Sequence, residues 1–158
     1  MVIGVPKEMK DHEYRVSLTP DSAASLCQNG HEVWIEPSAG VGSGFSDDEY
    51  RKVGATIASS KAEVFEKSEL ILKVKGPMWS ECVLFRPGHV LFTYLHLAAV
   101  PDVTKELLGR KVTAIAYETT EAKDGSLPML RPMSEIAGRM SIQIGAHYLE
   151  RTHGGRGV

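Results

Sequence analysis

Short apolar runs alternate along the chain with stretches that carry helix signals. The apolar runs fall at residues 2–5, 32–36, 70–74, 91–95 and 112–117. Their length and their content of β-branched and aromatic residues are typical of strands. Each run is followed by a loop and then by a segment with helix-capping or helix-breaking residues. This alternation predicts a doubly wound α/β domain, flavodoxin-like or Rossmann-like, with three layers and a mostly parallel sheet.

Capping residues mark where several helices begin and end. Thr19 and Pro20 suit the N-cap and first position of a helix that Gly30 ends. Capping-box patterns at residues 46–49 and 60–63 start two further helices.

Three more helices are expected in the second half of the chain. The segments 79–85 and 101–109 predict short helices. Ser134 can cap a long helix that reaches about Thr152, and apolar residues recur at helical spacing within it.

The charge balance argues against several classes of partner. The net charge is -2, from 18 basic and 20 acidic residues that are well interspersed. We therefore expect no nucleic-acid partner and no anionic membrane surface, and the apolar runs are too short to span a bilayer. The N-terminus lacks the features of a signal peptide, and two cysteines are too few for a disulfide framework. A cytoplasmic location is expected.

A glycine-rich loop at residues 40–44 follows the second predicted strand and precedes a helix. Its glycine spacing differs from the dinucleotide fingerprint, and no Gly-Lys-Ser/Thr follows it. We therefore interpret it as a flexible loop rather than as a phosphate-binding loop.

Candidate chemistry collects where predicted strands end. Arg15 follows the first strand, Lys75 a middle one, and His96 the next one along the chain. Because the carboxyl ends of parallel strands share one edge of the sheet, all three side chains can point into one crevice. Arginine can bind a carboxylate bidentately, lysine can hold a carboxylate or polarise a carbonyl, and histidine can transfer a proton near neutral pH. The three together predict a site for a small α-keto or α-amino acid.

Each of these residues also has an ordinary structural interpretation. Arg15 and Lys75 could be solvated surface charges, and His96 could be a hydrogen-bonded structural histidine. Their coincidence at one sheet edge is what favours function.

Nine short motifs are distributed along the whole chain: GVPKE (4–8), EYRV (13–16), GHEV (30–33), AGVGS (39–43), LKVK (72–75), LFTYLHLA (91–98), AYET (116–119), PMSEIAGR (132–139) and GGRGV (154–158). Together they resemble the motifs of the family that contains alanine dehydrogenases and the nicotinamide nucleotide transhydrogenase α chain. The pair Lys75 and His96 favours the alanine dehydrogenase branch.

The resemblance implies a role for each candidate residue. Arg15 and Lys75 would hold the substrate carboxylate, and His96 would exchange a proton with the carbonyl oxygen. Ser134 would contact NAD from the substrate domain, and Met133 would line the cleft. The reaction implied is oxidative deamination of L-alanine by NAD to pyruvate and ammonia. Full-length relatives imply a homo-oligomer, commonly a hexamer.

The resemblance also implies a domain division. Residues 1–132 would form the substrate domain, 133–153 an interdomain helix, and 154–158 the start of a linker to an NAD-binding domain that this sequence lacks. The chain is therefore expected to be truncated and inactive by itself. Two alternatives stay open: a non-catalytic binding or interaction module on the same scaffold, and a fragment of a transhydrogenase α chain.

Overall fold

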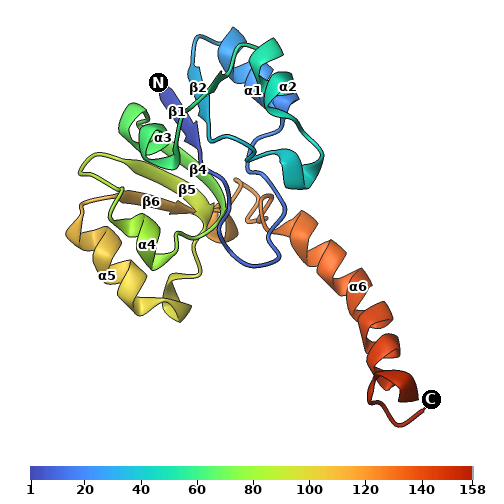
Figure 1. Ribbon diagram of the computed structural model, residues 1–158. Coiled ribbons are helices and arrows are strands. Elements are labelled where there is room, and N and C mark those ends of the chain that lie inside the picture. The colour runs from blue at the N-terminus through green and yellow to red at the C-terminus, as the bar shows by residue number, and fades with distance from the viewer. Residues whose placement is uncertain (158) are drawn as a thin grey trace. The chain divides into compact units, whose positions relative to one another are not determined.

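The computed structural model describes residues 1–157 and contains one six-stranded sheet (Figure 1). The strand order is β3-β2-β1-β4-β5-β6, and every neighbouring pair is parallel. The strands are β1 (Val2–Val5), β2 (Glu32–Ile35), β3 (Thr56–Ile57), β4 (Leu70–Lys75), β5 (Val90–Tyr94) and β6 (Thr113–Ala116). The chain returns to the middle of the sheet between β3 and β4, so the sheet is doubly wound as predicted.

Helices connect the strands on both faces of the sheet. They are α1 (Pro20–Gln28), α2 (Asp47–Lys52), α3 (Lys61–Lys67), α4 (Trp79–Cys82) and α5 (Pro101–Gly109), with short 3-10 turns η1 (Val41–Ser43), η2 (Leu97–Ala99) and η3 (Tyr117–Thr119). The three-layer α/β prediction is confirmed (Figure 1).

The two faces of strand β1 pack against different parts of the domain. Ile3 and Val5 pack into the cluster that includes residues of α1 and α2. Gly4 faces the opposite side, where an added Cβ would collide with Ser68 and Val64 beside α3. This alternation follows from the two-residue period of a strand. Glycine at position 4 lets α3 approach the centre of the sheet.

The chain divides into two compact units, one of residues 1–117 and one from Glu118 onward. The first unit contains the whole sheet. The second contains the long helix α6 (Arg131–Leu149) and the 3-10 turn η4 (Arg151–His153). The expected functional division at residues 132 and 153 stays a prediction. In the described part of the chain, no helix combines the length and the hydropathy that a membrane crossing requires.

Capping predictions succeeded where the cap is local. Thr19 accepts a hydrogen bond from the Ser22 N–H at the start of α1, and Ser46 forms the expected capping box with Glu49.

Other predicted helix ends were wrong. Ser134 is not an N-cap: α6 begins at Arg131, and the Ser134 N–H donates to the Leu130 carbonyl inside the helix. Pro132 in the first turn fits this earlier start, because proline needs no N–H partner there. Helix α6 also ends at Leu149 rather than near Thr152, and the helix expected at residues 79–85 stops at Cys82.

Strand β3 was not predicted from the sequence. It has only two residues, pairs with Trp34 and Ile35 at the edge of the sheet, and is too short to show periodicity.

Candidate functional site

Two of the predicted site residues lie together at the carboxyl end of the sheet. Lys75 is the last residue of β4 and pairs in register with Tyr94, the last residue of β5. His96 follows two residues later. All three line one cavity of about 160 Å³. The structure therefore brings the ammonium-bearing and imidazole-bearing residues of the prediction to a single cavity.

His96 has a conformation uncommon for a residue other than glycine. Its backbone is left-handed, with φ 49° and ψ 41°, where the chain leaves β5 and enters η2. Its ring is nearly parallel to that of Tyr94, with centroids 6.3 Å apart and an interplanar angle of 13°. Tyr94 thus flanks the imidazole on one side.

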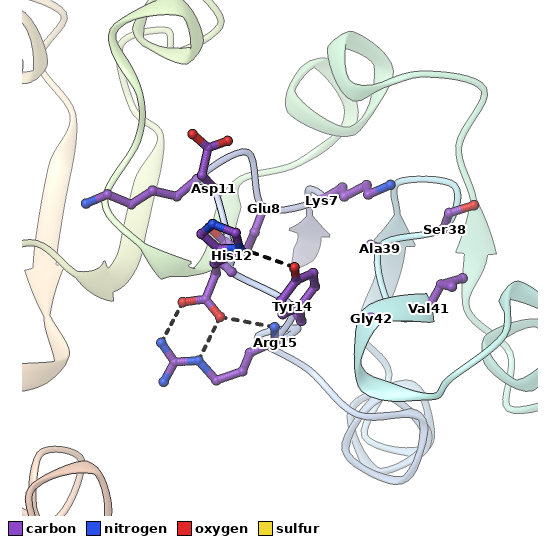
Figure 2. Close-up of a pocket in the computed structure, with 12 residues that line it drawn as sticks. Lys7, Glu8, Asp11, His12, Tyr14, Arg15, Ser38, Ala39, Val41 and Gly42 are labelled. Carbon is purple, nitrogen blue, oxygen red and sulfur yellow. Dashed lines mark hydrogen bonds and ion pairs between the residues drawn. The ribbon is translucent and has the colours of Figure 1, made fainter. Parts of the chain in front are cut away.

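Arg15 lies in the loop between β1 and α1 and is held by Glu13 (Figure 2). The Arg15 Nε and Nη2 donate to the two Glu13 carboxylate oxygens over 2.8 and 2.6 Å, and the Arg15 backbone N–H donates to one of them over 3.0 Å. These hydrogen bonds lower the pKa of Glu13 and raise that of Arg15. Such a fork fixes the orientation of the guanidinium.

Arg15 lines a second cavity, of about 550 Å³, on the side of the loop that faces residues 38–42 (Figure 2). Lys10 lines both cavities. Electrostatics connect them as well, because Lys75 helps to lower the pKa of Glu13 and Tyr94 helps to raise that of Arg15. Arg15 lines one of these cavities and Lys75 and His96 line the other; that all three side chains act in one crevice stays a prediction.

A buried ion network lies at the base of this loop. Lys73 points from the middle of β4 and is 1% exposed. Its Nζ is 3.1 Å from Glu81 Oε1 and 3.3 Å from Glu8 Oε2. Glu8 also accepts a hydrogen bond from the Val74 N–H over 2.7 Å, and Glu81 one from the Met78 N–H over 2.9 Å. Buried charges must be paired in this way to remain charged.

The two carboxyl groups of the network respond differently to burial. Burial raises the pKa of Glu8, and Lys73 offsets this only in part. Burial would also raise the pKa of Glu81, but Lys73, the Met78 N–H and Lys61 together bring it below its ordinary value. Glu81 is thus the more firmly ionised partner.

Lys61 extends the network to the start of the loop. Its Nζ donates to Glu81 Oε1 over 3.0 Å and to the Lys7 carbonyl over 2.9 Å. The Lys7 N–H donates to Glu36 Oε2 over 2.7 Å. The loop that carries Arg15 therefore leaves β1 from a point that is held through both the main chain and the Glu8 side chain.

The ring of Tyr117 packs against the ring of Tyr94. Their rings meet edge to face with centroids 5.0 Å apart, and Tyr117 meets Phe92 in the same way at 4.3 Å. Burial raises the pKa of Tyr117, so its phenol stays neutral at physiological pH. These aromatic contacts restrain the Tyr94 ring that flanks His96.

The glycine-rich loop packs against the Arg15 loop. A Cβ on Gly42 would lie 2.6 Å from the Tyr14 carbonyl oxygen. The Ser43 hydroxyl donates to that same carbonyl over 3.0 Å and accepts from the Val16 N–H over 3.2 Å. A Cβ on Gly40 would likewise meet the Tyr50 ring at 2.7 Å. Close packing against neighbouring protein atoms therefore accounts for the glycines at positions 40 and 42.

Ser134 and Met133 lie in the first turns of α6, in the second unit. Ser134 is exposed and Met133 is half-buried. Their proposed contact with a cofactor stays a prediction.

Sequence reasoning missed Glu8, Glu13, Lys73, Glu81 and Tyr94. One signal could have revealed Lys73. It interrupts the apolar run of β4, and a lysine inside a strand covered on both faces must find buried carboxylates. Glu13 gave no such signal, because its partner depends on how the loop folds.

Taken together, the fold and this edge of the sheet define a doubly wound α/β domain in which Lys75 and His96 line one cavity and Arg15 lines another. Residues 4–137 match the family model described as "Alanine dehydrogenase/PNT, N-terminal domain". The chain belongs to this family.

Curated relatives and solved structures agree with this assignment. The chain is 56% identical to an alanine dehydrogenase of Methanococcus maripaludis and 52% identical to that of Geobacillus stearothermophilus, over all of its 158 residues. It spans 42% of the length of each of these relatives. A solved L-alanine dehydrogenase superposes over the whole chain and 44% of its own, with TM-score 0.91 and 50% identity. A Sinorhizobium meliloti transhydrogenase superposes over 75% of the chain and 35% of its own, with TM-score 0.70 and 29% identity.

Proposed function

We propose that this chain forms the substrate-binding part of an NAD-dependent L-alanine dehydrogenase, which interconverts L-alanine and pyruvate with ammonia. The observation that carries the proposal is the shared cavity of Lys75 and His96, beside the loop that presents Arg15. The higher identity to alanine dehydrogenases than to the transhydrogenase supports this branch of the family over the other.

The roles of the site residues follow from their chemistry. The Lys75 ammonium would hold the substrate carboxylate and lie near the carbonyl oxygen. The His96 imidazole would give a proton to that oxygen or take one from it. Arg15 would bind the carboxylate through its guanidinium. Because Glu13 binds Nε and Nη2 of Arg15, a substrate carboxylate would compete with Glu13 for that edge of the guanidinium.

NAD would accept the hydride from the substrate carbon in such a reaction. Gly40 and Gly42 pack closely against Tyr50 and Tyr14, so packing accounts for these glycines, and the loop lacks the spacing of the dinucleotide fingerprint. We therefore assign only carboxylate binding and proton transfer to this chain. We also propose that Ser134 contacts NAD and that Met133 lines the cleft beside it.

Pyruvate titration tests the proposal directly. We expect calorimetry or ligand-observed NMR to detect pyruvate binding to the 158-residue chain, and R15A and K75A to weaken it at least about tenfold, because each removes a charge-assisted hydrogen bond. R51A is a matched control, since Arg51 is exposed and pairs with Asp48 away from both cavities. Equal affinity of R15A, K75A and wild type would refute the site.

A second measurement addresses the alternatives. We expect the chain alone to produce no measurable alanine-dependent NADH, because hydride transfer requires the nicotinamide to be held against the substrate carbon, and the chain spans only 42% of the length of its relatives. A chain that binds neither pyruvate nor alanine would instead favour a non-catalytic interaction module on the same scaffold.

We also propose that the chain self-associates and is cytoplasmic. The support for self-association is the exposed apolar surface of α6, which includes Ile136, Met140, Ile142, Ile144 and Leu149. The support for a reducing compartment is that Cys27 and Cys82 are both free thiols. Sedimentation velocity of wild type and I142E tests the first point: a monomeric wild type would contradict it.

A further inference from the structure

Three potential metal ligands meet at the end of α6, within the second unit. His147, Glu150 and His153 each offer one ligand atom, and these atoms all lie within 4.8 Å of one another. The three side chains are exposed to solvent. None of them belongs to the site described above.

A tight reversal of the chain creates this cluster (Figure 1). After α6 ends at Leu149, Glu150 adopts an extended backbone and η4 follows. Gly154 then takes a left-handed conformation with φ 86°, which glycine adopts without strain. The Gly155 N–H donates to the Glu150 carbonyl over 2.9 Å, and the Gly157 N–H to the Leu149 carbonyl over 3.0 Å.

The reversal places the two imidazoles against each other. The ring centroids of His147 and His153 are 3.7 Å apart, with an interplanar angle of 40°. On the other side, His153 Nδ1 lies 3.2 Å from Glu150 Oε2. An ion pair between Glu150 and a protonated His153 would explain only that second contact, and exposed pairs of this kind contribute little to stability. The proximity of His147 needs a further explanation.

The distances suit a tetrahedral metal. Ligands at 2.0–2.2 Å from a zinc ion are about 3.3 Å from one another, which is close to the observed separation of His153 and Glu150. The remaining separations are within 4.8 Å and need to close by up to about 1.5 Å, which rotation of exposed side chains can supply. The carboxyl end of a helix, with its partial negative charge, also favours a cation.

We propose that His147, Glu150 and His153 bind one divalent transition-metal ion of the zinc class and leave one coordination position for water or an added ligand. Two imidazole nitrogens and one carboxylate are a donor set that zinc accepts, whereas calcium and magnesium prefer oxygen ligands. Bound metal would join the last turn of α6 to η4 and hold the chain reversal in place. The proposal is independent of the catalytic role proposed for the first unit.

Zinc competition against a chromophoric chelator tests the site on the 158-residue chain. We expect one equivalent of Zn²⁺ per chain, with affinity that falls as the pH is lowered because metal and protons compete for the imidazoles. H147A, E150Q and H153A should each weaken binding at least about tenfold, since loss of a direct ligand costs no less than loss of a supporting contact. H12A is the control, because His12 is exposed and lies in the other unit.

Two results would overturn the proposal. One is undiminished Zn²⁺ affinity in the double variant H147A/H153A, which would assign the metal to other residues such as the thiols. The other is an absence of stoichiometric binding to the wild-type chain. Circular dichroism of each variant confirms that the helix content is unchanged.

Discussion

The Lys73 ammonium lies 3.1 Å from the Glu81 carboxylate, and both side chains are only 1% exposed. Charges of this kind are rarely removed from water, because desolvation costs several kcal/mol per ion. Here the pair, together with Glu8, anchors the loop that presents Arg15. The buried ion network of Glu8, Lys73 and Glu81 thus helps to position the loop that carries Arg15.

Removing the cation from this core should destabilise the fold strongly. K73M leaves Glu8 and Glu81 buried without their shared partner, and breaking a buried pair costs about 3–5 kcal/mol. Urea unfolding followed by circular dichroism measures the change in the free energy of unfolding. K52M is the control, since Lys52 is exposed at the end of α2 and should change stability by less than about 0.5 kcal/mol. Similar unfolding midpoints for K73M and K52M would contradict this account.

Glu13 should compete with the substrate for Arg15. In E13Q the side chain keeps its shape but loses its charge, so its hold on the Arg15 guanidinium weakens and its repulsion of a substrate carboxylate is removed. We expect pyruvate to bind several-fold more tightly to E13Q than to wild type in calorimetry. E32Q, at an exposed position on β2, should leave the affinity unchanged. Weaker binding by E13Q would show instead that Glu13 positions Arg15 for the substrate.

The close approach of the glycine-rich loop can be tested by adding one methyl group. In G42A the new Cβ would lie 2.6 Å from the Tyr14 carbonyl oxygen, so one loop must move, at a cost of about 1–3 kcal/mol. Because Tyr14 precedes Arg15, we also expect weaker pyruvate binding. The matched control is G109A, where no atom lies within 4 Å of the added Cβ. Wild-type stability and affinity in G42A would show that the loops are not tightly packed.

His89 predicts a pH dependence of stability. It is fully buried at the start of β5, and burial lowers the pKa of its imidazole below the ordinary 6.5. Below about pH 6.5, His89 therefore binds a proton more readily in the unfolded chain than in the folded chain. The contribution of His89 to stability is complete above that pH and decreases as the pH falls below it. The slope from one such group is at most about 1.4 kcal/mol per pH unit.

Comparison with H89Q isolates this contribution. Urea unfolding at pH 7.5 and at pH 5.5 should show a larger loss of stability in wild type than in H89Q, because glutamine does not titrate. The opposite carboxyl effect, from the raised pKa of Glu8, is present in both proteins and cancels in the comparison. Equal pH dependence in the two proteins would contradict the assignment to His89.

Much of the fold was predictable because the signals are local. The apolar runs that became β1, β2, β4, β5 and β6 can each be recognised within one short segment of the sequence. Thr19 and Ser46 cap helices through contacts a few residues away, so the sequence alone identified them. Ser134 failed as a cap because Pro132 had already set an earlier start for α6.

The sequence by itself indicated that Lys75 and His96 lie at or just past strand ends, and the parallel strand order then placed those ends side by side. Only the tertiary structure decided the rest of the site. Glu8, Lys73 and Glu81 come from three separate segments, and their charges persist in the interior only because the fold brings them within hydrogen-bond distance. The conformation of the loop between β1 and α1 likewise decides that Glu13 binds the Arg15 guanidinium and that Arg15 lines the cavity of about 550 Å³. Contacts between distant segments depend on packing, and no local pattern of residues encodes them.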